Sequence, residues 1–169
     1  MHETTPAQAD RPTTADRELV VSRVVDAPRE LVFEAFTAVR HLSQWWGPDG
    51  FTTTTSDFEF RVGGEWHFRM RGPDGTDYPE WIKWTLLSPP ERIEFRHGEY
   101  RDDPNSFESV LTFEPDGSAT RVTLRTLFAT ARQRDEAVEK YHAIEGGQQT
   151  LGNLAEYVAE LVASRRADR

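Results

Sequence analysis

Large apolar side chains alternate with charged and imidazole side chains in the stretch GGEWHFRM, residues 63–70. Trp66, Phe68 and Met70 occupy every second position of this stretch. A β-strand points successive side chains to opposite faces of its sheet, so the alternation predicts a strand with one wide apolar face. Such a face covers either a packed core or a cavity, and only a cavity would have room for a ligand.

The same alternation recurs along most of the chain, between short turn sequences. Asp-Gly pairs at the expected corners favour hairpin turns, and Pro-Pro also marks a turn. Consecutive strands joined by short turns form an antiparallel meander. We therefore predict strands at residues 18–26, 51–62, 64–71, 78–88, 92–100, 106–114 and 119–128.

Helical periodicity appears in the remaining segments. Pro28 lies near the start of a short helix, and Gly47-Pro48 ends a second one. Towards the C-terminus, apolar residues recur at steps of three and four, which predicts a long helix with one inward stripe. Gly146 and Gly147 interrupt this stripe, so we expect a kink or break there. The expected helices cover residues 27–37, 41–46 and 132–163.

The order β-αα-ββββββ-α predicts an α+β domain in which a curved antiparallel sheet wraps around the long C-terminal helix. The length of 169 residues suits one domain with its own core. We place this domain at residues 18–163. The flanking segments, residues 1–17 and 164–169, are polar and are expected to form a disordered arm and tail.

Composition narrows the classes of partner. The formal net charge is −9 and no basic cluster offsets it, so we expect no nucleic-acid partner. No apolar run approaches the roughly 20 residues of a membrane helix, so we expect no integral membrane contact. The N-terminal stretch lacks the apolar segment of a secretory signal, and we expect a cytoplasmic location.

Few motifs point to chemistry. The chain has no cysteine, which excludes disulfides, thiolate metal ligands and a cysteine nucleophile. The five histidines are scattered without metal-binding spacing, so we expect no metal site. Phosphate-loop, dinucleotide and Gly-x-Ser-x-Gly motifs are missing, and we expect no cofactor.

Four segments resemble a known family in the right order: QWWGPDGF, FRVGGEWHFRMRGPDG, SPPERIEF and GGQQTLGNLAEYV. The resemblance covers residues 18–162. It is to the branch of the START-like, or SRPBCC, superfamily that is named after the activator of heat-shock-protein-90 ATPase homologue. This resemblance implies the helix-grip fold, which is also that of the birch-pollen allergen. Relatives in the superfamily bind lipids, hormones or polyketides, and some are cyclases, whereas the branch name comes from a co-chaperone.

The chain departs from the branch at one position of the last helix. Tryptophan usually follows the glycine there, but Gly147 is followed by Gln148. The stripe through Tyr141, Ile144, Gln148 and Leu151 places this amide opposite the sheet, and a buried amide needs a hydrogen-bond partner. We therefore expect Gln148 to set the polarity of a ligand. The alternative is that the helix rotates at the glycines and that Gln148 faces solvent.

Turn positions also predict the strand registers. Two hairpins are centred on Pro89-Pro90 and on Asp116-Gly117. The strand at residues 64–71 is aligned with the strand at 78–88 by matching their apolar faces. The expected neighbours are Trp84 with Phe95, Ile82 with His97, Glu80 with Glu99, Leu111 with Val122, Ser109 with Leu124, Trp66 with Trp84, and Phe68 with Ile82.

Polar side chains gather at one end of the apolar sheet face. Glu80, His97 and Glu99 fall on the face that also carries the rings, and a dry core would not need them. A cavity with an apolar floor and a polar, solvent-accessible mouth would need such residues, and we expect Trp66 and Phe68 to form its floor. The alternative is a plain packed core. The expected ligand-binding residues are Trp66, Phe68, Met70, Tyr78, Glu80, Ile82, Trp84, Phe95, His97, Phe107, Leu124, Tyr141, Gln148 and Leu151.

Three functions remain open at this point. The first is a binding protein, monomeric or homodimeric, that holds a small apolar molecule in the cavity. The second is an enzyme of the cyclase or hydrolase kind, in which His97 with Glu80 or Glu99 would move protons on a bound substrate. The third is a co-chaperone that contacts a heat-shock protein through its surface.

Overall fold

The computed structural model describes residues 14–167 of the chain. Its main element is a seven-stranded sheet with the order β1-β7-β6-β5-β4-β3-β2, in which all neighbours are antiparallel. The predicted meander of β2 to β7 is confirmed, and β1 pairs with β7 at the edge of the sheet. The strands are β1 Glu18–Val25, β2 Thr52–Phe58, β3 Glu65–Arg71, β4 Asp77–Ser88, β5 Arg92–Gly98, β6 Phe107–Asp116 and β7 Ala119–Leu127.

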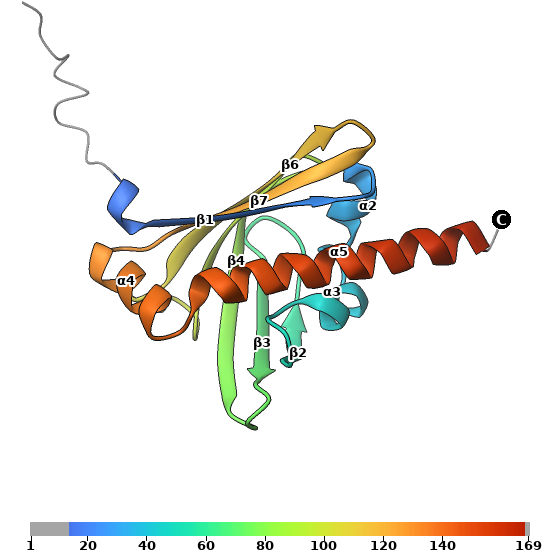
Figure 1. Ribbon diagram of the computed structural model, residues 1–169. Helices are drawn as coiled ribbons and strands as arrows, with labels where there is room; N and C mark the ends of the chain where they lie inside the picture. The colour runs from blue at the N-terminus through green and yellow to red at the C-terminus, as the bar shows by residue number, and fades with distance from the viewer. Residues whose placement is uncertain (1–13, 168–169) are drawn as a thin grey trace, which may run out of the picture.

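The long helix α5 (Ala143–Ala167) crosses the concave face of this curved sheet, as Figure 1 shows. Its buried residues are Leu151, Leu154 and Val158, which pack into the core. The predicted α+β helix-grip architecture is therefore confirmed. The other helical elements are η1 Ala15–Arg17, α2 Arg29–Glu34, α3 Val39–Trp45 and α4 Ala131–Glu139.

The break in the C-terminal helical region is not where we predicted it. It lies between α4 and α5, where His142 adopts a φ of 54°, and α5 runs unbroken through Gly146 and Gly147. A Cβ atom at Gly147 would lie 3.1 Å from Cγ2 of Val21 on β1. The missing side chain at Gly147 therefore lets α5 approach β1 closely instead of interrupting the helix.

The ends of the described chain also differ from expectation. The helix α5 continues to Ala167, past residue 163, where we expected the ordered domain to end. Arg17 of η1 donates a hydrogen bond to the carbonyl of Phe128, with an Nη1–O distance of 2.7 Å. Residues 1–13 of the predicted arm and 168–169 of the predicted tail lie outside the described residues.

The β4–β5 register is confirmed, because Trp84 pairs with Phe95 and Ile82 with His97. Two other predicted registers are wrong by two residues. The observed pairs are Leu111 with Leu124, Ser109 with Thr126, Trp66 with Ile82, and Phe68 with Glu80.

The β6–β7 error has a local cause. The two-residue turn is Gly117-Ser118, since Asp116 still pairs with Ala119, and Gly117 supplies the positive φ of 63°. A shift of two residues keeps every side chain on its predicted face, so the inner face was still assigned correctly. The expected Glu80–Glu99 pair does not form a ladder pair in the described sheet, because β5 ends at Gly98.

Candidate functional site

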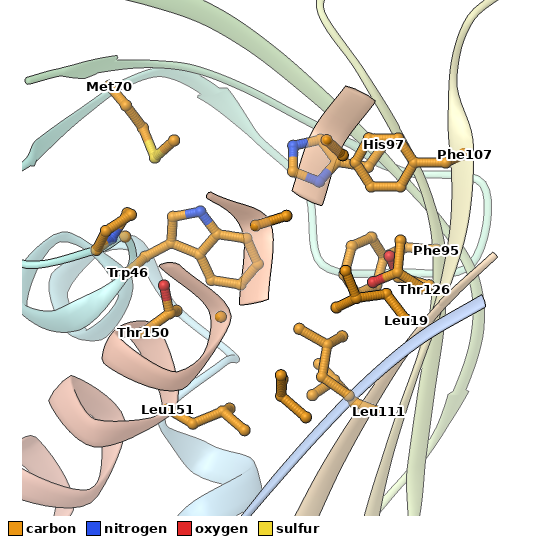
Figure 2. A pocket seen from close by; sticks show the side chains of 18 of the residues that line it. Leu19, Trp46, Met70, Phe95, His97, Phe107, Leu111, Thr126, Thr150 and Leu151 are labelled. Atoms are coloured by element: carbon orange, nitrogen blue, oxygen red, sulfur yellow. The ribbon is translucent and has the colours of Figure 1, made fainter. Parts of the chain in front are cut away.

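A cavity of about 250 Å³ lies between the concave sheet face, the end of α3 and the first turns of α5 (Figure 2). Leu19 and Val21 of β1 line one side, and Leu111 of β6 lies at the lower end in Figure 2. The remaining walls come mainly from rings and aliphatic side chains of β5, β7 and α5. The cavity is thus bordered by elements from both ends of the sequence.

Six of the residues that we expected at the site border this cavity. They are Met70, Phe95, His97, Phe107, Leu124 and Leu151. They come from four strands and α5, so the fold brings them together from segments far apart in the chain. Their placement around one hollow follows from the correct assignment of the inner face.

The expected floor of the cavity is instead packed core. Trp66, Phe68, Ile82 and Trp84 do not line the cavity, and each is at most 4% exposed. The ring of Trp66 stacks on that of Phe68, with 3.8 Å between the centroids. These four residues were therefore wrongly assigned to the cavity wall.

The physical reason is Trp46, which covers part of this face. Its ring centroid lies 5.1 Å from that of Trp66 and 6.2 Å from that of Phe68. On its other side, Trp46 borders the cavity beside Phe95 and His97. One indole thus separates the predicted floor from the open space, and Trp46 takes the place that we assigned to Trp66.

Local backbone features hold Trp46 in this position. Gly47 has a φ of 114°, a conformation that residues with a side chain rarely adopt, and it turns the chain directly after Trp46. The hydroxyl of Thr53 donates to the Trp46 carbonyl at 2.9 Å, and Asn153 of α5 donates to the Gly47 carbonyl at 2.9 Å. The sequence signal for this arrangement was the Trp-Trp-Gly-Pro segment, from which we expected a helix end and one buried and one partly exposed tryptophan ring against the sheet; Trp45 is buried and Trp46 is partly exposed.

A more polar hollow adjoins the cavity. Tyr78, Glu80 and Tyr141 line this second hollow, together with acidic residues of the β5–β6 loop and α4. It shares His97, Phe107, Phe128 and Ala137 with the apolar cavity. The arrangement corresponds to the polar mouth that the sequence predicted, although Tyr141 reaches it from the turn between α4 and α5.

His97 stands at the junction of the two hollows. Its Nε2 atom lies 2.8 Å from Oε1 of Glu80, and each side chain is 16% exposed. A carboxylate only accepts hydrogen bonds, so this contact places a proton on Nε2. No described residue hydrogen-bonds Nδ1 of His97, which leaves this nitrogen able to accept a proton or a hydrogen bond from a bound molecule.

Gln148 lies outside the cavity, which corrects our prediction. It is exposed and borders a surface hollow with Arg23 and Glu145. The residues of this turn that do line the cavity are Gly147, Thr150 and Leu151. The inward stripe of α5 passes through Gly147, which faces Val21, and Gln148 lies one position beyond that stripe.

Neither a cluster of metal ligands nor a membrane-spanning helix occurs in the described part of the chain. Residues 14–167 contain no group of three or more His, Cys, Asp or Glu side chains that could hold a metal ion. Within the same residues, no helix combines the length and apolar character needed to span a membrane.

The sequence profile of the Activator of Hsp90 ATPase homolog 1-like protein family matches residues 26–159. No curated protein gives a significant match to the chain.

Several solved structures share the fold. A crystal structure of a protein from Nitrosomonas europaea is 24% identical, with a TM-score of 0.79, and the match covers 88% of this chain and 98% of that one. A solution structure of a protein from Arthrobacter aurescens is 24% identical with a TM-score of 0.79, over 89% and 90% of the two chains. The AHSA1 protein from Silicibacter pomeroyi is 24% identical with a TM-score of 0.67, over 87% and 99%. At this identity the likeness supports the fold alone. The profile match spans most of the chain, and the protein therefore belongs to the Activator of Hsp90 ATPase homolog 1-like family.

Proposed function

We propose that the protein binds a small, largely apolar molecule in the cavity between its sheet and α5. The observation that carries this proposal is the cavity itself, about 250 Å³ of space bordered almost wholly by apolar side chains. Protein interiors are normally close-packed, and few voids exceed the size of a water molecule. An apolar cavity of about 150 Å³ is known to accept benzene, so this one has room for one or two rings.

The surroundings of the cavity support the same proposal. Ligand sites are typically apolar hollows with a few polar groups that orient the ligand, and His97 with the adjoining polar mouth supplies such groups. Proteins of the superfamily to which this family belongs generally bind hydrophobic ligands.

The test is to fill the cavity with a larger side chain and to compare this variant with one that carries the same substitution outside the cavity. Leu124 on β7 borders the cavity, and Leu127 on the same strand lies in a hollow on the opposite face of the sheet. Wild-type protein, Leu124→Trp and Leu127→Trp are titrated calorimetrically with toluene, indane and naphthalene. We expect the three compounds to bind wild-type protein and Leu127→Trp. Leu124→Trp is expected to bind them at least about tenfold more weakly than wild type, a loss of about 1.4 kcal/mol in binding free energy. Wild-type protein that binds none of the three would overturn the proposal.

The contact between His97 and Glu80 favours a second candidate, proton transfer on the bound molecule. A substrate with an acidic C–H bond next to a carbonyl group could give its proton to Nδ1 of His97 and form an enolate. The imidazolium that forms would be stabilised by the Glu80 carboxylate at 2.8 Å from Nε2.

This second candidate is tested by exchange of hydrogen for deuterium. Small cyclic ketones are incubated with the protein in heavy water, and loss of the signal of the α-hydrogens is followed by NMR. We expect exchange faster than in buffer, and a loss of this acceleration in Glu80→Gln and His97→Gln. Exchange at the buffer rate in wild-type protein removes the candidate and leaves the binding function unaffected.

A further inference from the structure

Two hydroxyl groups inside the cavity have no hydrogen-bond partner among the residues that the structure describes. Ser109 on β6 and Thr126 on β7 are directly opposite each other in the sheet, and both line the cavity. They are only 3% and 8% exposed. Among residues 14–167, no group makes a hydrogen bond to either side-chain hydroxyl, and neither oxygen is sealed off from the space of the cavity. In Figure 2 the Thr126 side chain points into the open space between Phe95 and Leu19.

Other buried hydroxyls of the protein are satisfied. Thr120 donates to the Ala27 carbonyl at 2.7 Å, and Ser106 accepts a hydrogen bond from Arg96 at 2.9 Å. Thr150, which also lines the cavity, donates to the Gly146 carbonyl at 2.8 Å. Because buried polar groups are almost always hydrogen-bonded, the missing partners of Ser109 and Thr126 must come from whatever occupies the cavity.

The neighbours of the two hydroxyls cannot supply those partners. Ser109 is flanked across the sheet by Phe95 on β5, and Thr126 by Leu19 on β1. Apolar side chains therefore border the hydroxyls on both sides along the sheet. An apolar ligand alone would fill the space but leave both hydroxyls unpaired.

We propose that Ser109 and Thr126 form a subsite for a neutral oxygen group of the ligand, a hydroxyl or a carbonyl. This inference rests on the proposed binding function and specifies its ligand class. Each hydroxyl can donate and accept, which suits either oxygen group. No Asp, Glu, Lys or Arg is among the described residues that line the cavity, so a buried ionic group would lack a counter-charge.

Size completes the assignment of the ligand class. About 250 Å³ accommodates one or two rings but not a long acyl chain folded within it. The ligand class is therefore a compact phenol or cyclic ketone whose oxygen points towards Ser109 on β6 and Thr126 on β7.

The experiment compares ligands that differ only in the oxygen group. Naphthalene with 1-naphthol, toluene with p-cresol, and indane with 1-indanone are titrated into wild-type protein. We expect the oxygenated member of each pair to bind about three- to tenfold more tightly, in line with one or two neutral hydrogen bonds. Equal affinities within all three pairs overturn this inference while leaving the binding function intact. If neither member of any pair binds, the binding function fails, and this inference fails with it.

Variants connect that preference to the two hydroxyls. Ser109→Ala and Thr126→Val remove one hydroxyl each with little change in volume, and the double variant removes both. Thr112→Val is the matched control, because Thr112 lies on β6 but on the opposite face, paired with Thr123. The preference for oxygenated ligands is expected to decline in each variant, to vanish in the double variant and to persist in the control.

Stability offers a readout that is independent of any ligand. Each substitution removes a hydroxyl that no described residue hydrogen-bonds, so the Tm of Ser109→Ala and Thr126→Val is expected to stay level or rise. A double variant that keeps the full preference for oxygenated ligands would overturn the assignment. So would a crystal structure with bound 1-naphthol whose oxygen lies at the polar mouth instead of beside Ser109 or Thr126.

Discussion

The indole of Trp46 meets the indole of Trp66 edge-on, with ring centroids 5.1 Å apart and ring planes inclined at 74°. One of these tryptophans belongs to the core and the other forms the boundary of the cavity. Trp66 is fully buried, and its Nε1 atom donates to the hydroxyl of Thr55 at 3.0 Å. Trp46 is partly exposed and lines the open space.

This difference predicts unequal costs of truncation. Trp66→Ala is expected to lower the free energy of unfolding by about 3 to 5 kcal/mol, as for a large core side chain. Trp46→Ala is expected to cost less, because its ring already borders a void, and to enlarge the cavity towards Trp66. Chemical denaturation measures both values. Equal costs for the two variants would contradict the assignment of Trp46 to the cavity wall.

Neighbouring positions on α5 give a second prediction. Gly147→Leu introduces a side chain at the cavity, where even a Cβ atom would lie 3.1 Å from Val21. We expect a loss of about 1 to 3 kcal/mol from overpacking, and blocked binding of naphthalene. Gln148→Leu, one residue further on the exposed side, is the matched control and is expected to change stability by less than about 0.5 kcal/mol. Reduced affinity in Gln148→Leu would show that α5 is rotated from its described orientation.

Glu65 predicts a dependence of stability on acid pH. This carboxylate lies on the convex face, where Trp81 and Arg101 donate to it, each at 2.8 Å. Burial opposes its ionisation, but hydrogen bonds from Arg101, Trp81 and His67 outweigh burial and lower its pKa from 4.5 to about 2. The folded state therefore binds this proton less readily than the unfolded state does.

The stabilisation from Glu65 is complete above about pH 4.5 and is lost as the pH falls through about 2. We expect Glu65→Gln to cost about 2 kcal/mol at pH 7, with the difference from wild type shrinking between pH 4.5 and 2. Glu91→Gln is the control, since Glu91 is 64% exposed and 3.9 Å from Arg29. A difference that does not change with pH would disprove the role of the charge.

His41 predicts a second pH effect with the same sign. It is buried under α5, where its Nδ1 contacts the hydroxyl of Tyr157. Burial lowers the pKa of His41, with Arg40 adding to the effect, so the unfolded chain binds this proton more readily. Stability is therefore expected to fall as the pH drops below about 6.5.

His41→Asn is expected to flatten this part of the stability profile, measured as Tm between pH 5 and 8. The exposed His142 provides the matched variant, His142→Asn, which should leave the profile as it is in wild type. An unchanged profile in His41→Asn would assign the pH dependence to other groups.

The sequence predicted the faces of the sheet more securely than the pairing of its strands. Side chains alternate with a period of two, so Leu111 and Ser109 were assigned to the inner face although their predicted partners were wrong by two residues. The register depended on which residues occupy a two-residue turn, and Asp116-Gly117 and Gly117-Ser118 are both acceptable turn sequences.

The cavity was harder to predict because its extent depends on where side chains fail to fill the space between the sheet and α5, which the apolar pattern does not show. Ser109 and Thr126 fall on the inner face in the sequence pattern, but only the structure shows that no described residue hydrogen-bonds their hydroxyls. Trp46 follows a short helix and has no periodic signal, so its contact with Trp66 could not be deduced. Gln148 was misplaced because the inward position of that turn of α5 is Gly147, which has no side chain to mark it in the apolar pattern.

The short helix α4 has a consequence for the rates at which a ligand would enter and leave. None of its residues is buried, whereas α5 contributes three buried residues to the core. Segments with few buried contacts open at low free energy, and Ala137 of α4 borders both the cavity and its polar mouth. We therefore expect the residence time of a bound molecule to depend on how often α4 detaches. Substitutions in α4 should then change association and dissociation rates together, and those on β6 and β7 should mainly change dissociation.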